Sequence, residues 1–96
     1  MSDSPVPSDV TDARSFLEFA KALLADRELE VAMEKESPSS PYGAGHRGWE
    51  NGTIEGFLSA AIRWAEDTDF GQRQGVEPDE VWHQFALFLY LGKIYE

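Results

Sequence analysis

Apolar residues recur at helical spacing over most of the chain, most regularly between residues 53 and 67. There they fall at positions i, i+3, i+4 and i+7, while polar residues fill the opposite side. The apolar positions are Ile54, Phe57, Leu58, Ala61, Trp64 and Ala65. Asn51 or Thr53 can accept a hydrogen bond from a free amide of the first turn. The pattern predicts an amphipathic helix over 53–67.

A longer helical pattern precedes this segment, over residues 12–36. Its apolar stripe consists of Phe16, Leu17, Ala20, Leu23, Leu24 and Val31. Thr11 or Asp12 can cap the first turn, and Asp26 could cap a second start. The sequence therefore leaves two arrangements open, one continuous helix or two helices with a bend near residue 26.

The last segment, over 78–92, is apolar around its whole circumference. Pro78 suits the first position of a helix, and the apolar side chains that follow are Val81, Trp82, Phe85, Ala86, Leu87, Phe88, Leu89, Tyr90 and Leu91. A helix that is apolar on all sides is ordinarily buried on all sides. Two other helices cover only part of it, so we expect a homodimer through residues 78–96. The alternative is a monomer whose chain is not helical after residue 91.

The sequence predicts an all-α protein, a small bundle of three to four helices over 12–36, 53–67 and 78–92. The Ser/Pro-rich residues 1–10 are expected to be a disordered N-terminal tail. Residues 11–96 then form a single helical domain, with an exposed loop over 37–48 where proline and glycine are concentrated. The expected core anchors are Trp49, Trp64 and Trp82, which lie on or beside apolar stripes.

Charge narrows the partners that this domain can have. The 96 residues carry 18 acidic and 8 basic side chains, a formal net charge of −10. Such a surface repels nucleic acids and anionic lipids. There is no cysteine, and no stretch approaches the roughly 18 apolar residues of a membrane span. The start of the sequence also lacks the features of a signal peptide. We expect a cytoplasmic protein that binds neither nucleic acid nor membrane.

No motif for catalysis or metal binding is complete. Asp67 and Asp69 open a stretch like a calcium loop, but glycine, glutamine and proline occupy positions five, six and twelve, where an EF-hand needs an oxygen ligand, glycine and glutamate. Neither His46 nor His83 has a second histidine at the i+4 spacing of a zinc-binding helix. We predict no catalytic residue, no metal and no cofactor.

Three short motifs carry a family resemblance: Trp49-Glu50-Asn51, Trp82 followed by Phe85-Ala86, and Ile94-Tyr95-Glu96. With this pattern the chain resembles a family of small bacterial proteins described as a domain of unknown function, over roughly residues 49–96. The resemblance implies a compact, mainly helical domain and no particular activity. The chain departs from the pattern in its Pro/Ser/Gly-rich insertion at 37–48.

The resemblance directs attention to Glu50, Asn51 and Asp67, which together with Asp69 and Glu96 make up the candidate polar cluster. In a structural interpretation, Asn51 caps the helix that follows it, and Glu50 pairs with Lys93 or with main-chain amides. In a functional interpretation, these acidic residues form a face that receives a cationic partner. The sequence does not decide between the two.

The function predicted from these observations is a non-enzymatic, acidic protein-interaction module that binds a basic protein, of an antitoxin, immunity or regulatory type. One alternative is a small carboxylate-based or metal-dependent hydrolase that uses Glu50, Asp67 and Asp69. The other is a structural subunit of a homodimer.

Overall fold

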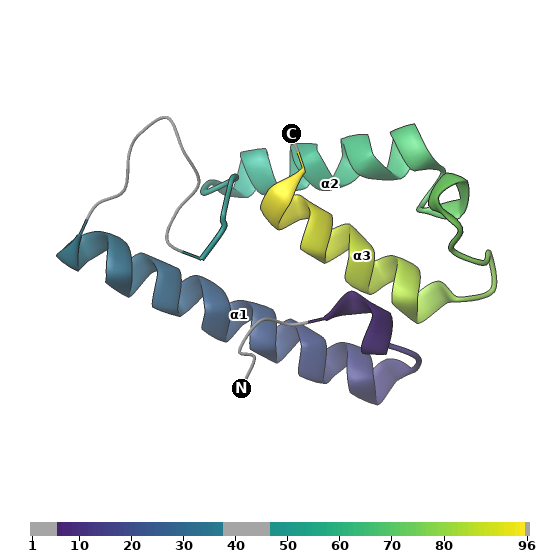
Figure 1. Cartoon of the computed structure of the whole chain (residues 1–96), viewed down its shortest axis with the longest axis horizontal. Helices are drawn as coiled ribbons and strands as arrows, with labels where there is room; N and C mark the ends of the chain where they lie inside the picture. The colour runs from purple at the N-terminus through teal and green to yellow at the C-terminus, as the bar shows by residue number, and fades with distance from the viewer. Residues whose placement is uncertain (1–5, 38–46, 96) are drawn as a thin grey trace.

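The computed structural model describes residues 6–37 and 47–95, and within them it contains three α-helices and no strand. The helices are α1 (Ala13–Glu36), α2 (Ile54–Thr68) and α3 (Val81–Ile94), with short 3-10 helices η1 (Pro7–Asp9) and η2 (Gln72–Gln74). Figure 1 shows α3 lying between α1 and α2, which hardly contact each other. The predicted all-α class is confirmed.

Helix α1 is continuous through residue 26, because its start is well capped and nothing interrupts it. Asp12 Oδ1 accepts a hydrogen bond from the Ser15 amide at 2.8 Å, and Ser15 Oγ accepts one from the Asp12 amide at 3.1 Å. These two bonds form a reciprocal capping box. Of the two arrangements that the sequence left open, the structure has the single helix.

Helix α1 buries a different face from the one that its leucines predict. Leu17 and Leu24 are 54% and 59% exposed. The buried residues of α1 are Phe19, Leu23, Asp26 and Glu30. The two acids can lie inside because the following loop and α3 supply hydrogen-bond partners for them. The predicted stripe is therefore wrong for Leu17, Leu24 and Val31, which are all exposed.

Helix α2 begins where Thr53 Oγ1 accepts a hydrogen bond from the Gly56 amide at 3.0 Å. Thr53, not Asn51, is therefore its N-cap. Helices α2 and α3 approach each other so closely that a Cβ on Gly92 of α3 would lie 2.9 Å from the ring of Phe57 on α2. This approach explains why glycine stands inside α3 despite its low helix propensity.

Helix α3 begins at Val81, three residues later than predicted. The Glu80 amide donates to the Glu77 carbonyl at 3.0 Å, which closes a turn with Pro78 in its second position. Proline favours that turn position, since its fixed φ suits it. At its other end α3 continues to Ile94, so of the residues 91–96 that the sequence left undecided, 91–94 are helical and Tyr95 is the C-cap.

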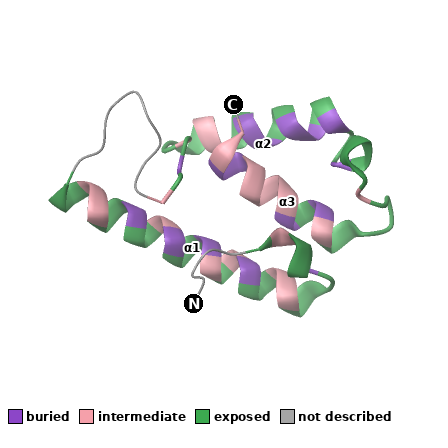
Figure 2. Cartoon of the chain, viewed as in Figure 1, coloured by how far each residue is buried: buried purple, intermediate pink, exposed green. Residues whose placement is uncertain are grey.

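Three elements of the same chain cover α3: helix α1, helix α2 and the 3-10 helix η1 all pack against it. Eleven of its 14 residues are buried or half-buried, as Figure 2 shows. Contacts within one chain thus cover much of the apolar surface of α3. A homodimer through 78–96 remains a hypothesis.

The described part of the N-terminal segment is folded, where we predicted a disordered tail over 1–10. Pro7–Asp9 forms η1, and Val10 is buried in the core beside Phe19. Residues 1–5 lie outside the described part of the chain, as does 38–46 within the predicted loop.

Two of the three tryptophans are core anchors. Trp49 and Trp64 are buried, and Trp64 Nε1 donates to Gln74 Oε1 at 3.1 Å. Trp82 is 37% exposed and packs its ring against Phe16 and Phe85 at the edge of the fold. Trp82 is therefore an edge residue.

Candidate functional site

The carboxylate of Asp26 lies at the centre of a buried ionic cluster. Its side chain, on α1, accepts hydrogen bonds from three partners that follow in the sequence. Lys93 Nζ and Trp49 Nε1 donate to Oδ2 at 2.7 and 2.9 Å, and Arg47 Nε donates to Oδ1 at 2.5 Å. Asp26 is only 3% exposed. A buried carboxylate is tolerated when it is paired in this way.

Glu30 extends the cluster by one turn of α1. Its Oε1 accepts a hydrogen bond from the Arg47 amide at 2.8 Å. The ammonium group of Lys93 also lies 5.3 Å from the centre of the Trp49 ring, a cation–π distance. Among the described residues, no buried side-chain nitrogen or oxygen lacks a hydrogen-bond partner. Asp26, Glu30, Arg47, Trp49 and Lys93 together are called the Asp26 cluster below.

The hydrogen bonds of the Asp26 cluster keep its central carboxylate ionised. Burial by itself raises the pKa of Asp26, but the hydrogen bonds from Lys93, Arg47 and Trp49 outweigh it and lower the pKa below its ordinary value. An acid/base catalyst at neutral pH needs a carboxyl pKa shifted the other way. The cluster is therefore suited to holding the fold together.

The first and last family motifs meet in space. The Glu50 and Asn51 amides both donate to the Lys93 carbonyl, at 3.0 and 3.3 Å. Asn51 Nδ2 donates to the carbonyls of Gly92 and Tyr95, at 3.0 and 3.1 Å. These bonds satisfy carbonyls that the end of α3 leaves free. Asn51 thus caps the C-terminus of α3, whereas the sequence suggested that it caps the start of α2.

Asp67 belongs to the same arrangement through Tyr95. The Tyr95 hydroxyl donates to Asp67 Oδ2 at 2.6 Å, which raises the pKa of Tyr95 because ionisation would set two negative charges side by side. The Arg63 guanidinium lies 5.9 Å from the centre of the same ring. Asn51 and Asp67 therefore hold opposite ends of Tyr95, its carbonyl and its hydroxyl. This placement favours the structural interpretation of both residues.

The other candidate polar residues are placed separately. The side chain of Glu50 is exposed. The Lys93 ammonium group, which we expected to pair with it, donates to Asp26 instead. Asp69 is an exposed residue at the C-cap of α2, in the left-handed conformation. Glu96 lies outside the described residues. Glu50 thus contacts Lys93 only through its main-chain amide, and the expected pairing through the Glu50 carboxylate is not what the structure has.

The three carboxylates of the hydrolase alternative do not share a site. Glu50 precedes α2 and Asp69 follows it, and a helix of 15 residues is about 22 Å long. Within residues 6–37 and 47–95, no three histidine or acidic side chains are grouped as metal ligands. Nothing in this geometry supports the hydrolase.

Sequence reasoning missed the centre of the arrangement, although a signal was present. Phe19, Leu23, Asp26 and Glu30 follow one another at spacings of four, three and four residues, so they share one helical face. Two acids on an otherwise apolar face mark a position that needs buried basic partners. Arg47 had no such signal, because it stands in a loop without periodicity.

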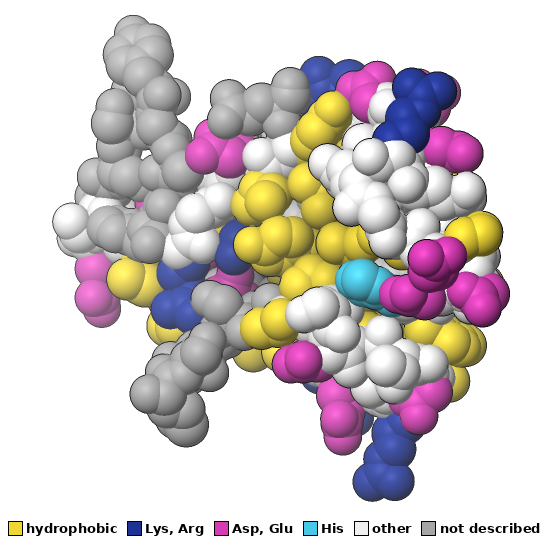
Figure 3. Space-filling model, turned by 45° about the vertical axis from the view of Figure 1, so that its right-hand side comes forward, with side chains coloured by type: hydrophobic (Ala, Val, Ile, Leu, Met, Phe, Trp, Pro, Cys, Tyr) yellow, Lys and Arg dark blue, Asp and Glu magenta, His cyan; other side chains and the backbone are white. Residues whose placement is uncertain are grey.

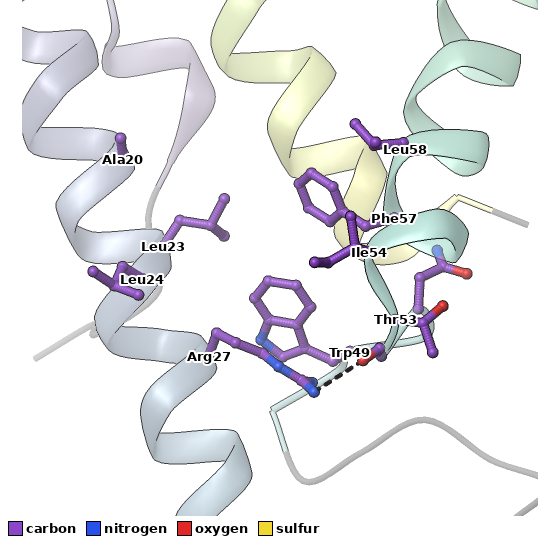
Figure 4. A pocket seen from close by; sticks show the side chains of 11 residues that line it. Ala20, Leu23, Leu24, Arg27, Trp49, Thr53, Ile54, Phe57 and Leu58 are labelled. Carbon is purple, nitrogen blue, oxygen red and sulfur yellow. Dashed lines mark hydrogen bonds between the residues drawn. The ribbon is translucent and has the colours of Figure 1, made fainter.

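An apolar groove lies between α1 and α2, and Trp49 is one of the residues that line it. Its volume is about 490 Å³. Figure 4 shows Ala20 and Leu24 of α1 on one side, Ile54 and Leu58 of α2 on the other, and the Trp49 ring between them. At one end the Arg27 guanidinium lies 5.2 Å from the centre of the Trp49 ring and donates to the Gly52 carbonyl at 3.3 Å.

The described residues define a class: a small protein with three helices, in which the end of α3 is joined to α1 by a buried ionic cluster and to α2 by the hydrogen bond between Tyr95 and Asp67. The chain belongs to DUF7660, a family of unknown function whose sequence profile matches residues 12–96. No curated protein and no solved structure matches it. Of the helices in the described residues, none is long and apolar enough to cross a membrane.

Proposed function

We propose that this chain is a cytoplasmic, non-enzymatic interaction module that binds and blocks a basic partner protein, in the manner of an antitoxin or immunity protein. The observation that carries the proposal is the distribution of charge. In the Asp26 cluster, the acids Asp26 and Glu30 are balanced by the bases Arg47 and Lys93. The cluster thus contributes no net charge, and the formal net charge of −10 belongs to the remaining residues.

A surface with this excess of acids attracts cationic proteins and speeds their association. In Figure 3, hydrophobic side chains gather in the middle of the visible face, while acidic and basic side chains lie around its edge. An apolar centre with a polar rim is the usual anatomy of a protein interface. Within the described residues, by contrast, every buried side-chain nitrogen and oxygen already has a hydrogen-bond partner.

Affinity capture from the native cell lysate tests the proposal. The tethered chain is exposed to lysate at about 50 mM and about 500 mM salt, since screening at the higher concentration shortens the Debye length to a few ångströms. We expect one basic protein to bind at low salt and to be depleted at high salt. Beads that carry polyglutamate are the control for simple cation exchange. Recovery of nothing at either salt, or of the same proteins on polyglutamate, would contradict the proposal.

A further inference from the structure

A small pocket lies between the C-terminal end of α2 and helix α3. Its volume is about 310 Å³, and its apolar walls are Ile62, Ala65, Phe70 and Phe88. The rings of Phe70 and Phe88 stack with their centres 6.0 Å apart and their planes at 19°. Phe70 is 41% exposed, so part of this aromatic surface is open to solvent. The Phe70 pocket, as we call it below, is at the lower end of the size range of ligand sites, which suits a single side chain.

The charged residues that line the Phe70 pocket are both acids, Glu66 and Asp69. Both are exposed, and within residues 6–37 and 47–95 neither carboxylate has an ion pair or a hydrogen bond. The bases nearest in the sequence are placed elsewhere: Arg63 lies over the Tyr95 ring, and Arg73 is not part of the pocket lining. The pocket therefore presents negative charge, which no described base neutralises, beside aromatic rings.

The end of α2 adds to this negative potential. The last carbonyls of a helix carry a partial negative charge, so acids at this end are unfavourable and bases are favourable. Helix α2 has no basic residue in its last turn, although Glu66 stands in that turn and Asp69 is the C-cap. A cation supplied by another molecule would offset the repulsion between these groups. The local charge thus selects a positively charged occupant.

We propose that the Phe70 pocket receives one arginine side chain of a basic partner protein, whose guanidinium group pairs with Glu66 and Asp69. The aliphatic stem of that arginine packs against Ile62 and Phe88. The inference rests on the proposed function, since it names the surface and the anchoring residue of the partner. Arginine fits because its planar guanidinium group stacks on aromatic rings and has donors for two carboxylates, whereas the lysine ammonium group is a compact point charge.

Other occupants fit the Phe70 pocket less well. A calcium ion needs six to eight oxygen ligands, and the apolar walls of the pocket supply none from their side chains. Within the described parts of the chain, no three acidic or histidine side chains are grouped as metal ligands. A second copy of the chain would bring another formal charge of −10, and like charges oppose that association. An arginine of a basic protein matches both the apolar walls and the acids.

The test titrates the full chain with N-acetylarginine amide and with N-acetylcitrulline amide, and follows the backbone amides by NMR. Citrulline has the shape of arginine but carries a neutral urea group. The pocket variant combines Glu66→Gln with Asp69→Asn, because asparagine tolerates the left-handed conformation of this position. The matched control combines Glu28→Gln with Glu55→Gln, two exposed acids outside the pocket lining. Both variants change the net charge equally, and thermal melting verifies that both fold.

The arginine compound is expected to bind the unmodified chain with about millimolar affinity, as is usual for so small a ligand, and to shift the amides of Phe70 and Phe88. The citrulline compound should bind about threefold more weakly or worse. The pocket variant should weaken binding of the arginine compound by a similar factor, about threefold or more, because two ion pairs are lost. The control should stay within about 1.5-fold, since distant charges are screened. Equal affinity for the two compounds, equal losses in the two variants, or no shift at about 20 mM compound would overturn the inference.

Lysate capture with the same two variants separates this inference from the proposed function. A basic protein that the unmodified chain and the control capture, and that the pocket variant loses, would support both. Capture that the pocket variant leaves unchanged would retain the proposed function and overturn the inference, since the partner would then bind another surface. Selective binding of the arginine compound together with failed capture would retain the arginine pocket and contradict the proposed function.

Discussion

Lys93 Nζ donates a 2.7 Å hydrogen bond to Asp26 Oδ2, between residues 67 positions apart in the sequence. Through this contact the end of α3 is joined to the middle of α1. The Lys93 carbonyl accepts hydrogen bonds from the Glu50 and Asn51 amides, so the same residue also connects the loop before α2. Lys93, itself on α3, therefore connects this helix to α1 through its side chain and to the loop before α2 through its main chain.

Substitution of Asp26 should destabilise the fold strongly. Asp26→Asn keeps the shape of the side chain but removes the carboxylate charge that the buried ammonium group of Lys93 contacts. We expect the free energy of unfolding to fall by about 3 kcal/mol or more, measured by urea denaturation. Glu28→Gln, at an exposed position of the same helix, is the control and should change it by less than about 0.5 kcal/mol. Similar losses in both variants would contradict the role of the cluster.

The contribution of Asp26 should also depend on pH. The folded state lowers the pKa of Asp26, so the stabilisation is complete above the ordinary carboxyl pKa of about 3.9 and is lost as the pH falls through the lower, folded value. The difference in unfolding free energy between the unmodified chain and Asp26→Asn should therefore shrink from pH 6 toward about pH 2. Denaturation curves across this range measure it, and a constant difference would show that the residue does not titrate as described.

Gly92→Ala should destabilise the contact between α2 and α3. A Cβ at this position would lie 2.9 Å from ring atoms of Phe57, and overpacking of this kind costs about 1–3 kcal/mol. The gain in helix propensity, about 1 kcal/mol, offsets only part. In Gly52→Ala the new Cβ would be no closer than 3.6 Å to its neighbours, and this control should be tolerated. Adding Phe57→Leu to Gly92→Ala should recover stability; no recovery would refute the steric explanation.

The cap that Asn51 places on α3 can be tested by two substitutions of different character. Asn51→Ala removes the hydrogen bonds to the Gly92 and Tyr95 carbonyls and should cost about 1 kcal/mol. Asn51→Asp sets a carboxylate against those two carbonyl oxygens and should cost more. Amide hydrogen exchange in the last turn of α3 reports the effect locally. Faster exchange in Asn51→Ala than in Asn51→Asp would reverse the predicted order.

The sequence predicted much of the fold because the signals for it are local. Helical periodicity placed the three helices, and the capping residues Asp12 and Thr53 were among the candidates at their starts. The start of α3 was predicted three residues too early, because Pro78 suits both the first turn of a helix and a β-turn. In the structure Pro78 lies in a β-turn. The exposed face of α1 was misjudged, because leucines alone do not reveal that two acids have partners elsewhere.

The candidate site was predicted only in part. Asn51 and Asp67 were singled out, and both contact Tyr95, but their common partner could not be read from the sequence. Glu50 was selected for its side chain, whereas the structure uses its amide. Asp26 was considered only as a possible helix cap, since its partners stand 21 to 67 positions further along the chain.

The sequence by itself determined the all-α class, most of the helix boundaries and the acidic character of the chain, because periodicity, capping and charge depend on neighbours within a few turns. Only the tertiary structure decided which face of α1 is buried, where Lys93 finds its counter-charge and that a groove stays open between α1 and α2. A buried charge is stable only where distant segments bring partners to it. That pairing turns α1 so that Asp26 faces inward and Leu24 faces the groove.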